Sequence, residues 1–242
     1  MSFYDLDTSP DTTRAEKLVA KDADGSKQHE KVSEHAPSHV DDAELLARSL
    51  EFPSKFLDGG GLNDSLFQDA YTHGASAQRL PEGWVTHEVC VHKRFENRAI
   101  ARRAGSDGKR AKPDFTYIGS FHMTARELRD TQLPAEQVKR VRVYDAGTDP
   151  ADPLHAEIIA DATGLEKLQR HELRVQLMNL AQKRGLYVSP FLNEEGMRRA
   201  TSSQCALVQP SEQTLTTDEQ AIVNVAKASS ATALPSSGDI AA

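Results

Sequence analysis

Residues 115–128, FTYIGSFHMTAREL, decide the fold more than any other stretch of this chain. Aromatic and β-branched residues dominate the first seven positions, and this composition predicts a strand from Phe115 to Phe121. Thr124 and Glu127 then have the spacing of a capping box, which predicts that a helix begins there. A strand followed at once by a capped helix indicates a mixed α and β domain.

The chain on the C-terminal side of this stretch continues in the same manner. Strands are predicted over about 138–144 and 154–160, and a long helix with a leucine stripe is predicted over about 164–184. Gly185 suits the position just after that helix. The apolar residues at 186–188 predict a last short strand.

The chain on the N-terminal side shows a period of two from Trp84 to His92, which predicts a further strand. The predicted order within residues 81–192 is therefore two strands, a helix, two strands, a helix and a strand. Short connections favour antiparallel pairing of neighbouring strands. We therefore expect an α+β fold, a small two-layer sandwich with a mainly antiparallel sheet and two covering helices.

Residues 40–80 are expected to form a helical and linker segment outside that core. Asp41 and Glu44 repeat the capping-box spacing, and the apolar residues that follow are four positions apart, so a helix is predicted over 41–51. A helix this short has to bury its apolar stripe on the core or on a partner. The side chains expected to dock on a partner are Leu46, Leu50, Phe52 and Phe56.

The two ends of the chain are rich in polar residues. Only 38% of the 242 residues are hydrophobic, which is low for a chain that buries its whole length. Residues 1–39 are expected to be a polar N-terminal arm, and residues 193–242 a low-complexity C-terminal arm. Both arms are expected to be extended or disordered.

The segment between the first two predicted strands is strongly basic, although the whole chain has a formal charge of −7. It is expected to project as a basic arm that binds nucleic acid or an acidic protein. A solvated loop without a partner is the plain alternative. The basic residues are Lys93, Arg94, Arg98, Arg102, Arg103, Lys109, Arg110 and Lys112.

His87, Cys90 and His92 are residue types that bind metals or act in catalysis. In a strand His87 points away from the other two, so no metal site is predicted, because a structural zinc site needs four ligands. Cys90 and His92 would share one face of that strand, which leaves a thiol-dependent enzyme as one alternative. The sequence contains no P-loop, dinucleotide-binding or serine-hydrolase motif.

These observations favour a non-enzymatic structural or assembly protein. Its core and arms would dock on protein partners, or on copies of itself, in a virion or similar multi-subunit particle. A nucleic-acid-associated accessory protein that uses residues 93–112 is the second possibility, and an enzyme centred on Cys90 is the third. No cofactor is expected. The N-terminus lacks a signal sequence and no apolar run is long enough to span a membrane, so a cytoplasmic location, with possible incorporation into a particle, is expected.

Overall fold

The computed structural model describes residues 13–21, 39–80, 85–105, 110–136, 138–147 and 152–209. The two predicted arms lie mainly outside these ranges. The parts that fall inside them belong to the fold, because residues 14–21 form a helix and residues 194–208 form a helix and a strand. The folded core is therefore wider than residues 81–192.

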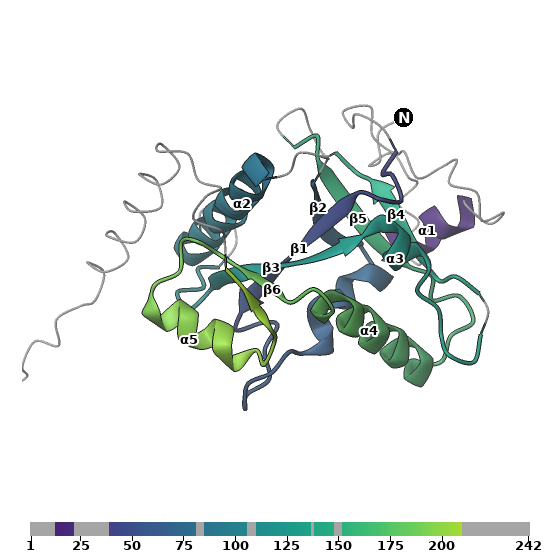
Figure 1. Ribbon diagram of the computed structural model, residues 1–242. Helices are drawn as coiled ribbons and strands as arrows, with labels where there is room; N and C mark the ends of the chain where they lie inside the picture. The colour runs from purple at the N-terminus through teal and green to yellow at the C-terminus, as the bar shows by residue number, and fades with distance from the viewer. Residues whose placement is uncertain are drawn as a thin grey trace, which may run out of the picture.

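A seven-stranded sheet with the order β4-β5-β2-β1-β3-β6-β7 forms the centre of the molecule (Figure 1). All neighbouring strands are antiparallel except β6 and β7. The prediction of an α+β fold with a mainly antiparallel sheet is confirmed. The strands are β1 Leu45–Phe52, β2 Ala75–Leu80, β3 Thr116–Thr124, β4 Val141–Asp145, β5 His155–Ala160, β6 Leu186–Val188 and β7 Leu207–Val208.

Helices pack on both faces of this sheet, so the predicted two-layer arrangement is incomplete. We call the side with Leu46 and Leu50 the first face; it holds the main core, to which η3, α3, α4 and α5 contribute. The opposite, second face carries Ala47 and packs against α2, while Tyr144 and Ile159 pack against α1. The helices are α1 Arg14–Lys21, the 3-10 helix η3 Asp64–Tyr71, α2 Val85–Ala104, α3 Ala125–Arg129, α4 Lys167–Gln182 and α5 Glu194–Ser202.

The stretch that decides the fold behaves as predicted. It forms β3 and then α3, and the Thr124 side chain accepts a hydrogen bond from the Glu127 backbone while the Glu127 carboxylate accepts one from the Thr124 backbone. Gly119 is required inside β3, because a β-carbon there would lie 2.4 Å from the Tyr187 carbonyl oxygen of β6. Gly185, the expected residue after α4, has a positive φ of 80°.

Two predictions of secondary structure are wrong. Residues 45–52 form the strand β1 and not a helix, and β1 lies between β2 and β3 in the middle of the sheet. Residues 85–104 form α2, so the described part of the strand predicted over residues 84–92 is helical. The segment 40–80 therefore belongs to the core, because it supplies two strands and η3.

The chain from β2 through α2 to β3 makes a crossover. β2 and β3 both run antiparallel to β1, which separates them, so they are parallel to each other. Leu45 pairs with Leu80 at the end of β2, whereas Phe52 pairs with Thr116 at the start of β3. The chain must therefore travel back along the sheet between these two strands, and α2 makes this return on the second face.

Candidate functional site

The second face of the sheet fixes which side of α2 points to solvent. Val91, Phe95 and Ala99 are four residues apart and are buried, at 6%, 6% and 1% exposure, in one apolar cluster. Their partners in that cluster include Leu80 and Tyr117. The opposite side of α2 is therefore held outward. Of the predicted basic residues on this helix, three are exposed and two, Arg102 and Arg103, are partly buried.

Seven of the eight predicted basic residues lie in the described ranges, and Lys109 lies outside them. Five belong to α2, which replaces the projecting loop or hairpin that the sequence predicts. Two, Arg110 and Lys112, are exposed on the connector between α2 and β3. We call these seven residues the basic surface: Lys93, Arg94, Arg98, Arg102, Arg103, Arg110 and Lys112.

Arg94 ties α2 to the neighbouring strands. Its guanidinium forms an ion pair with Asp152, whose carboxylate also accepts a hydrogen bond of 3.1 Å from Gln78 Nε2 on β2. Asp152 is buried and the Arg94 side chain is 42% exposed. Arg94 therefore positions the helix and offers only part of its charge to a ligand.

Arg103 ties the other end of α2 to the start of β3. It donates hydrogen bonds of 3.0 Å to Glu96 Oε1 and 3.1 Å to the Phe115 carbonyl oxygen. The Lys112 backbone N–H donates to the Arg102 carbonyl oxygen at 3.1 Å. These contacts hold the connector against the C-terminal end of α2, so the cations of the two segments form one surface.

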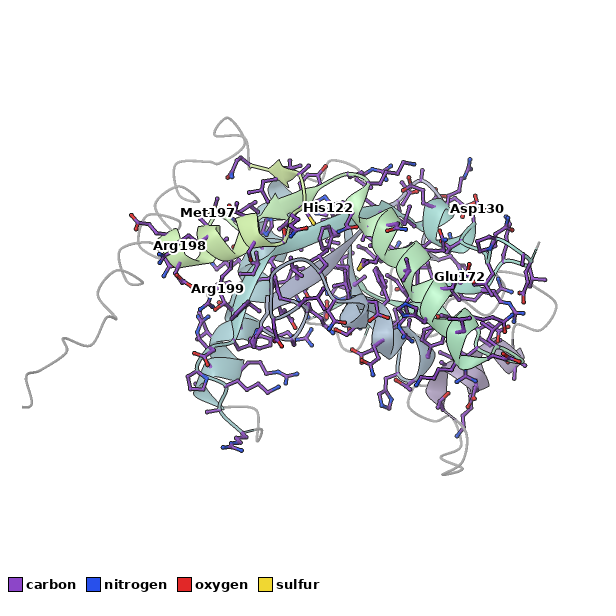
Figure 2. All side chains as sticks on the ribbon, turned by 90° about the horizontal axis from the view of Figure 1, so that it is seen from below. His122, Asp130, Glu172, Met197, Arg198 and Arg199 are labelled. Carbon is purple, nitrogen blue, oxygen red and sulfur yellow. The ribbon has the colours of Figure 1, made fainter. Side chains whose placement is uncertain are left out.

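α5 supports the start of β3 from its other side. Arg199 donates a hydrogen bond of 3.0 Å to Thr116 Oγ1, and its guanidinium lies 4.1 Å from the centre of the Phe52 ring. Figure 2 shows Arg198 and Arg199 on α5 at one end of the molecule, and Asp130 and Glu172 toward the other. The connector therefore leads into a strand whose start is fixed on this side as well.

The remaining cations of the basic surface have no ion pair within the described part of the chain. Among the side chains that the structure describes near them in sequence, the acidic ones are Glu96, which Arg103 binds, and Asp114. Arginine guanidinium groups bind phosphate oxygens in a two-pronged manner, whereas lysine binds them as a point charge. Both kinds are present among these cations, which are Lys93, Arg98, Arg102, Arg110 and Lys112.

A layer of buried polar side chains lies on the second face close to α2. His92 of α2 is 1% exposed, and its Nδ1 lies 2.6 Å from the Tyr117 hydroxyl oxygen. His122 of β3 is also 1% exposed. Its Nε2 lies 3.1 Å from Ser120 Oγ, and its ring stacks on Tyr187 with centroids 3.8 Å apart. Burial, with smaller contributions from His92 and Arg184, lowers the pKa of His122 to about 3.

The Ser120–His122 pair has the residue types of a nucleophile and its base, but its surroundings do not suit that chemistry. Ser120 has 0% exposure, so a substrate cannot reach its hydroxyl in this conformation. A histidine whose pKa is about 3 is a weak base at neutral pH. The pair is better explained as a hydrogen-bonded part of the layer between the sheet and α2.

Cys90 and His92 are not brought together, which corrects the expectation that they share one face of a strand. Two residues that are two positions apart in a helix point to nearly opposite sides. Cys90 is exposed, whereas His92 is buried against Tyr117. The side chain of His87 is outside the described part of the structure. Among the described residues, no group of three His, Cys, Asp or Glu side chains is placed to hold a metal ion.

The four side chains expected to dock on a partner lie within the fold. Leu46 and Leu50 have 0% exposure and Phe56 has 9%, and all three belong to the main core. Phe52 is partly buried against that core and lies beneath Arg199. The apolar stripe that a helix would have offered to a partner is instead the part of β1 that builds the first face.

Sequence reasoning missed two residues of this site, Asn97 and Asp152. Asn97 lies on the exposed side of α2, and Asp152 receives Arg94. The signal for the helix was present in the four-residue spacing of Val91, Phe95 and Ala99, but the alternation of valines before it favoured a strand. The Arg94–Asp152 pair depends on the sheet order and has no local signal.

Within the described ranges, no helix has both the length and the apolar character that crossing a membrane requires. Comparison of the chain with protein-family models, with curated protein sequences and with solved structures gives no match. The function therefore has to be inferred from the surface itself.

Proposed function

We propose that this protein binds the phosphate groups of a nucleic acid through the basic surface, as a non-enzymatic accessory protein. One observation carries the proposal. Three cations of α2 and two of the adjoining connector have no ion pair within the described residues; they are Lys93, Arg98, Arg102, Arg110 and Lys112. The chain as a whole has a formal charge of −7, so this concentration is a local feature and not a consequence of composition.

The packing of α2 supports this proposal. Burial of Val91, Phe95 and Ala99 fixes the rotation of the helix, so its cations are held in place on the surface. Arg94 and Arg103 are bound at the two ends of the basic part of the helix. A binding surface that is already ordered loses less conformational entropy when a ligand binds.

An assembly role within a larger particle was the first expectation from the sequence, and it stays a proposal. Its two main grounds were the arms, which lie mainly outside the described residues, and the apolar side chains of residues 46–56, most of which are buried in the core. The basic surface is the stronger ground, and it favours the proposal of a nucleic-acid function.

The test is the salt dependence of binding. The affinity of the full chain for a fluorescent nucleic acid, measured by anisotropy, should fall steeply with salt, with a logarithmic slope of about 0.9 per phosphate contact on a duplex. Replacement of Arg98 and Arg102 by Gln should weaken binding at least about tenfold and reduce the slope by about two.

A matched control removes two cations from the opposite face. Arg126 of α3 and Lys167 of α4 are exposed and belong to no ion pair of the described residues, and both helices pack on the first face (Figure 1). The Arg126→Gln, Lys167→Gln variant has the same net charge as the test variant and should bind almost as the wild type does. Equal weakening by the two variants, or no binding at low salt, would contradict the proposal.

A further inference from the structure

The outermost line of α2 carries small or short neutral side chains. Cys90, Asn97 and Ala104 are exposed, and Ala101 is partly exposed; their spacing places them along one line of the helix. This line is opposite the buried stripe of Val91 and the residues that follow it at four-residue intervals. The part of α2 farthest from the sheet is therefore narrow.

Three arginines run beside that line. Arg94, Arg98 and Arg102 are each four residues apart, so they form a stripe along one flank with a rise of about 6 Å per step. A twenty-residue helix is about 30 Å long. Cations arranged along such a line suit an extended chain of phosphates better than a single compact anion.

The exposed side of α2 lacks the means to bind single-stranded nucleic acid by stacking. Phe95, the aromatic residue of α2 in the described side chains, is 6% exposed and belongs to the buried cluster. Binding of single strands generally relies on aromatic side chains on which the bases stack. A duplex, whose bases are already stacked, requires only contacts to its backbone and grooves.

We infer that α2 lies in the major groove of duplex DNA, with Arg98 and Arg102 directed at the phosphates along one edge of the groove. Arg94, bound to Asp152, contributes only part of its charge there. The major groove of B-form DNA is about 12 Å wide and admits a helix, whereas the deep groove of A-form RNA is too narrow. The narrow outer line of α2 allows this approach. The inference rests on the proposed function, and it adds the class of nucleic acid and the side of the helix that enters it.

The experiment compares three ligands with the full chain: a labelled 20-base-pair DNA duplex, one strand of it alone, and the RNA duplex of the same sequence. Anisotropy titrations at about 0.1 M salt should give a dissociation constant for the DNA duplex at least about tenfold lower than for the other two. Equal or tighter binding of the single strand or the RNA duplex overturns the groove inference and leaves phosphate binding intact. No binding to any of the three, or to heparin, at low salt removes the proposed function itself.

A variant at the outer line tests the groove directly. Asn97→Trp leaves every cation in place but widens the helix where it would enter the groove, so affinity for the DNA duplex should fall at least about tenfold. Affinity for heparin, a polyanion without grooves, should stay within about twofold. Leu168→Trp, at a 75% exposed position of α4, is the control and should bind both ligands as the wild type does. Unchanged duplex affinity in Asn97→Trp, with its helix content intact by circular dichroism, overturns the inference.

Discussion

Two segments of this molecule carry the same local motif and fold differently. Thr124 and Glu127 form a complete capping box, and α3 begins there. Asp41 and Glu44 have the same spacing, and the Asp41 backbone N–H donates to Glu44 Oε2 at 3.3 Å, yet a turn follows and then the strand β1. The hydrogen bonds of the motif can close a turn, but they do not determine what the next residues form.

The two segments are also neighbours, and this contact explains the difference. The Ala125 backbone N–H donates to the Glu44 carbonyl oxygen at 3.0 Å, and the Arg126 backbone N–H donates to the Asp42 carbonyl oxygen at 2.9 Å. Arg79 binds both carboxylate oxygens of Glu44 at 2.7 Å. The first segment is thus held by Arg79 and by α3, whereas the second combines its own capping box with ion pairs from Glu127 to Lys183 and Arg184.

Removal of Arg79 should have the largest effect, because it breaks the tertiary support of the first segment. Arg79 also lies 3.2 Å from Asp145, which has 0% exposure, so Arg79→Ala leaves two buried carboxylates without their cation. We expect the free energy of unfolding, measured in urea, to fall by about 3–5 kcal/mol. Arg126→Ala, at an exposed site, should change it by less than about 0.5 kcal/mol. A loss below about 1 kcal/mol for Arg79→Ala would show that Glu44 does not depend on it.

His122 lies on β3, which pairs with β1 and so joins the two segments, and it should make the stability of the fold depend on pH. Its pKa is about 3 in the folded chain and near 6.5 in the unfolded chain, so the unfolded chain binds a proton first as the pH falls. The contribution of His122 to the free energy of unfolding is complete above about pH 6.5. It is lost progressively down to about pH 3, by about 1.4 kcal/mol per pH unit at most.

The variant that isolates this effect is His122→Gln, whose amide can replace the contact of Nε2 with Ser120. Urea unfolding of both proteins at pH values from 7 to 4 should show that the wild type loses more stability than the variant, with a difference of about 2–3 kcal/mol by pH 4. Because the carboxylates are the same in both proteins, their titration cancels in this difference. Parallel stability curves would mean that His122 is not held neutral by burial.

Removal of each capping side chain should have the smallest effect on the free energy of unfolding, and it tests the comparison most directly. Thr124→Ala should reduce the free energy of unfolding by about 1 kcal/mol, because the Glu127 N–H loses its acceptor at the start of α3. Asp41 is exposed and its Oδ1 accepts a bond of 2.8 Å from the Ala43 N–H within a turn, so Asp41→Ala should cost less than about 0.5 kcal/mol. Equal losses in thermal unfolding would remove the distinction between the two motifs.

The elements that the sequence predicts correctly are those whose local signals agree with one another. β3 has strand-forming residues, α3 has a complete capping box, and α4 has a long leucine stripe with Gly185 after it. The sequence predicts a helix at β1 because a spacing of four residues fits both structures. Leu46 and Leu50, four positions apart, lie on one face of a strand as well as on one side of a helix. Pairing with β2 and β3 makes these residues a strand, and no local sequence pattern indicates that pairing.

The candidate site was predictable in composition but not in form. The basic residues could be identified from the sequence, but their arrangement along α2 could not, because the valines before Val91 imitate a strand. The pairing of Arg94 with Asp152 and of Arg103 with the Phe115 carbonyl oxygen depends on the crossover between β2 and β3. Contacts between residues so far apart in the chain leave no periodic signal.

The central place of β1 has a consequence for how the chain is made. Leu46 pairs with Arg79 on one side and with Met123 on the other. During synthesis β1 leaves the ribosome long before β3, and its second edge stays open while the whole of α2 is being added. An open edge on an apolar strand is a site of aggregation. Folding of this protein should therefore be most vulnerable in that interval, and chaperones that cover exposed strands should raise its yield most when translation is slow.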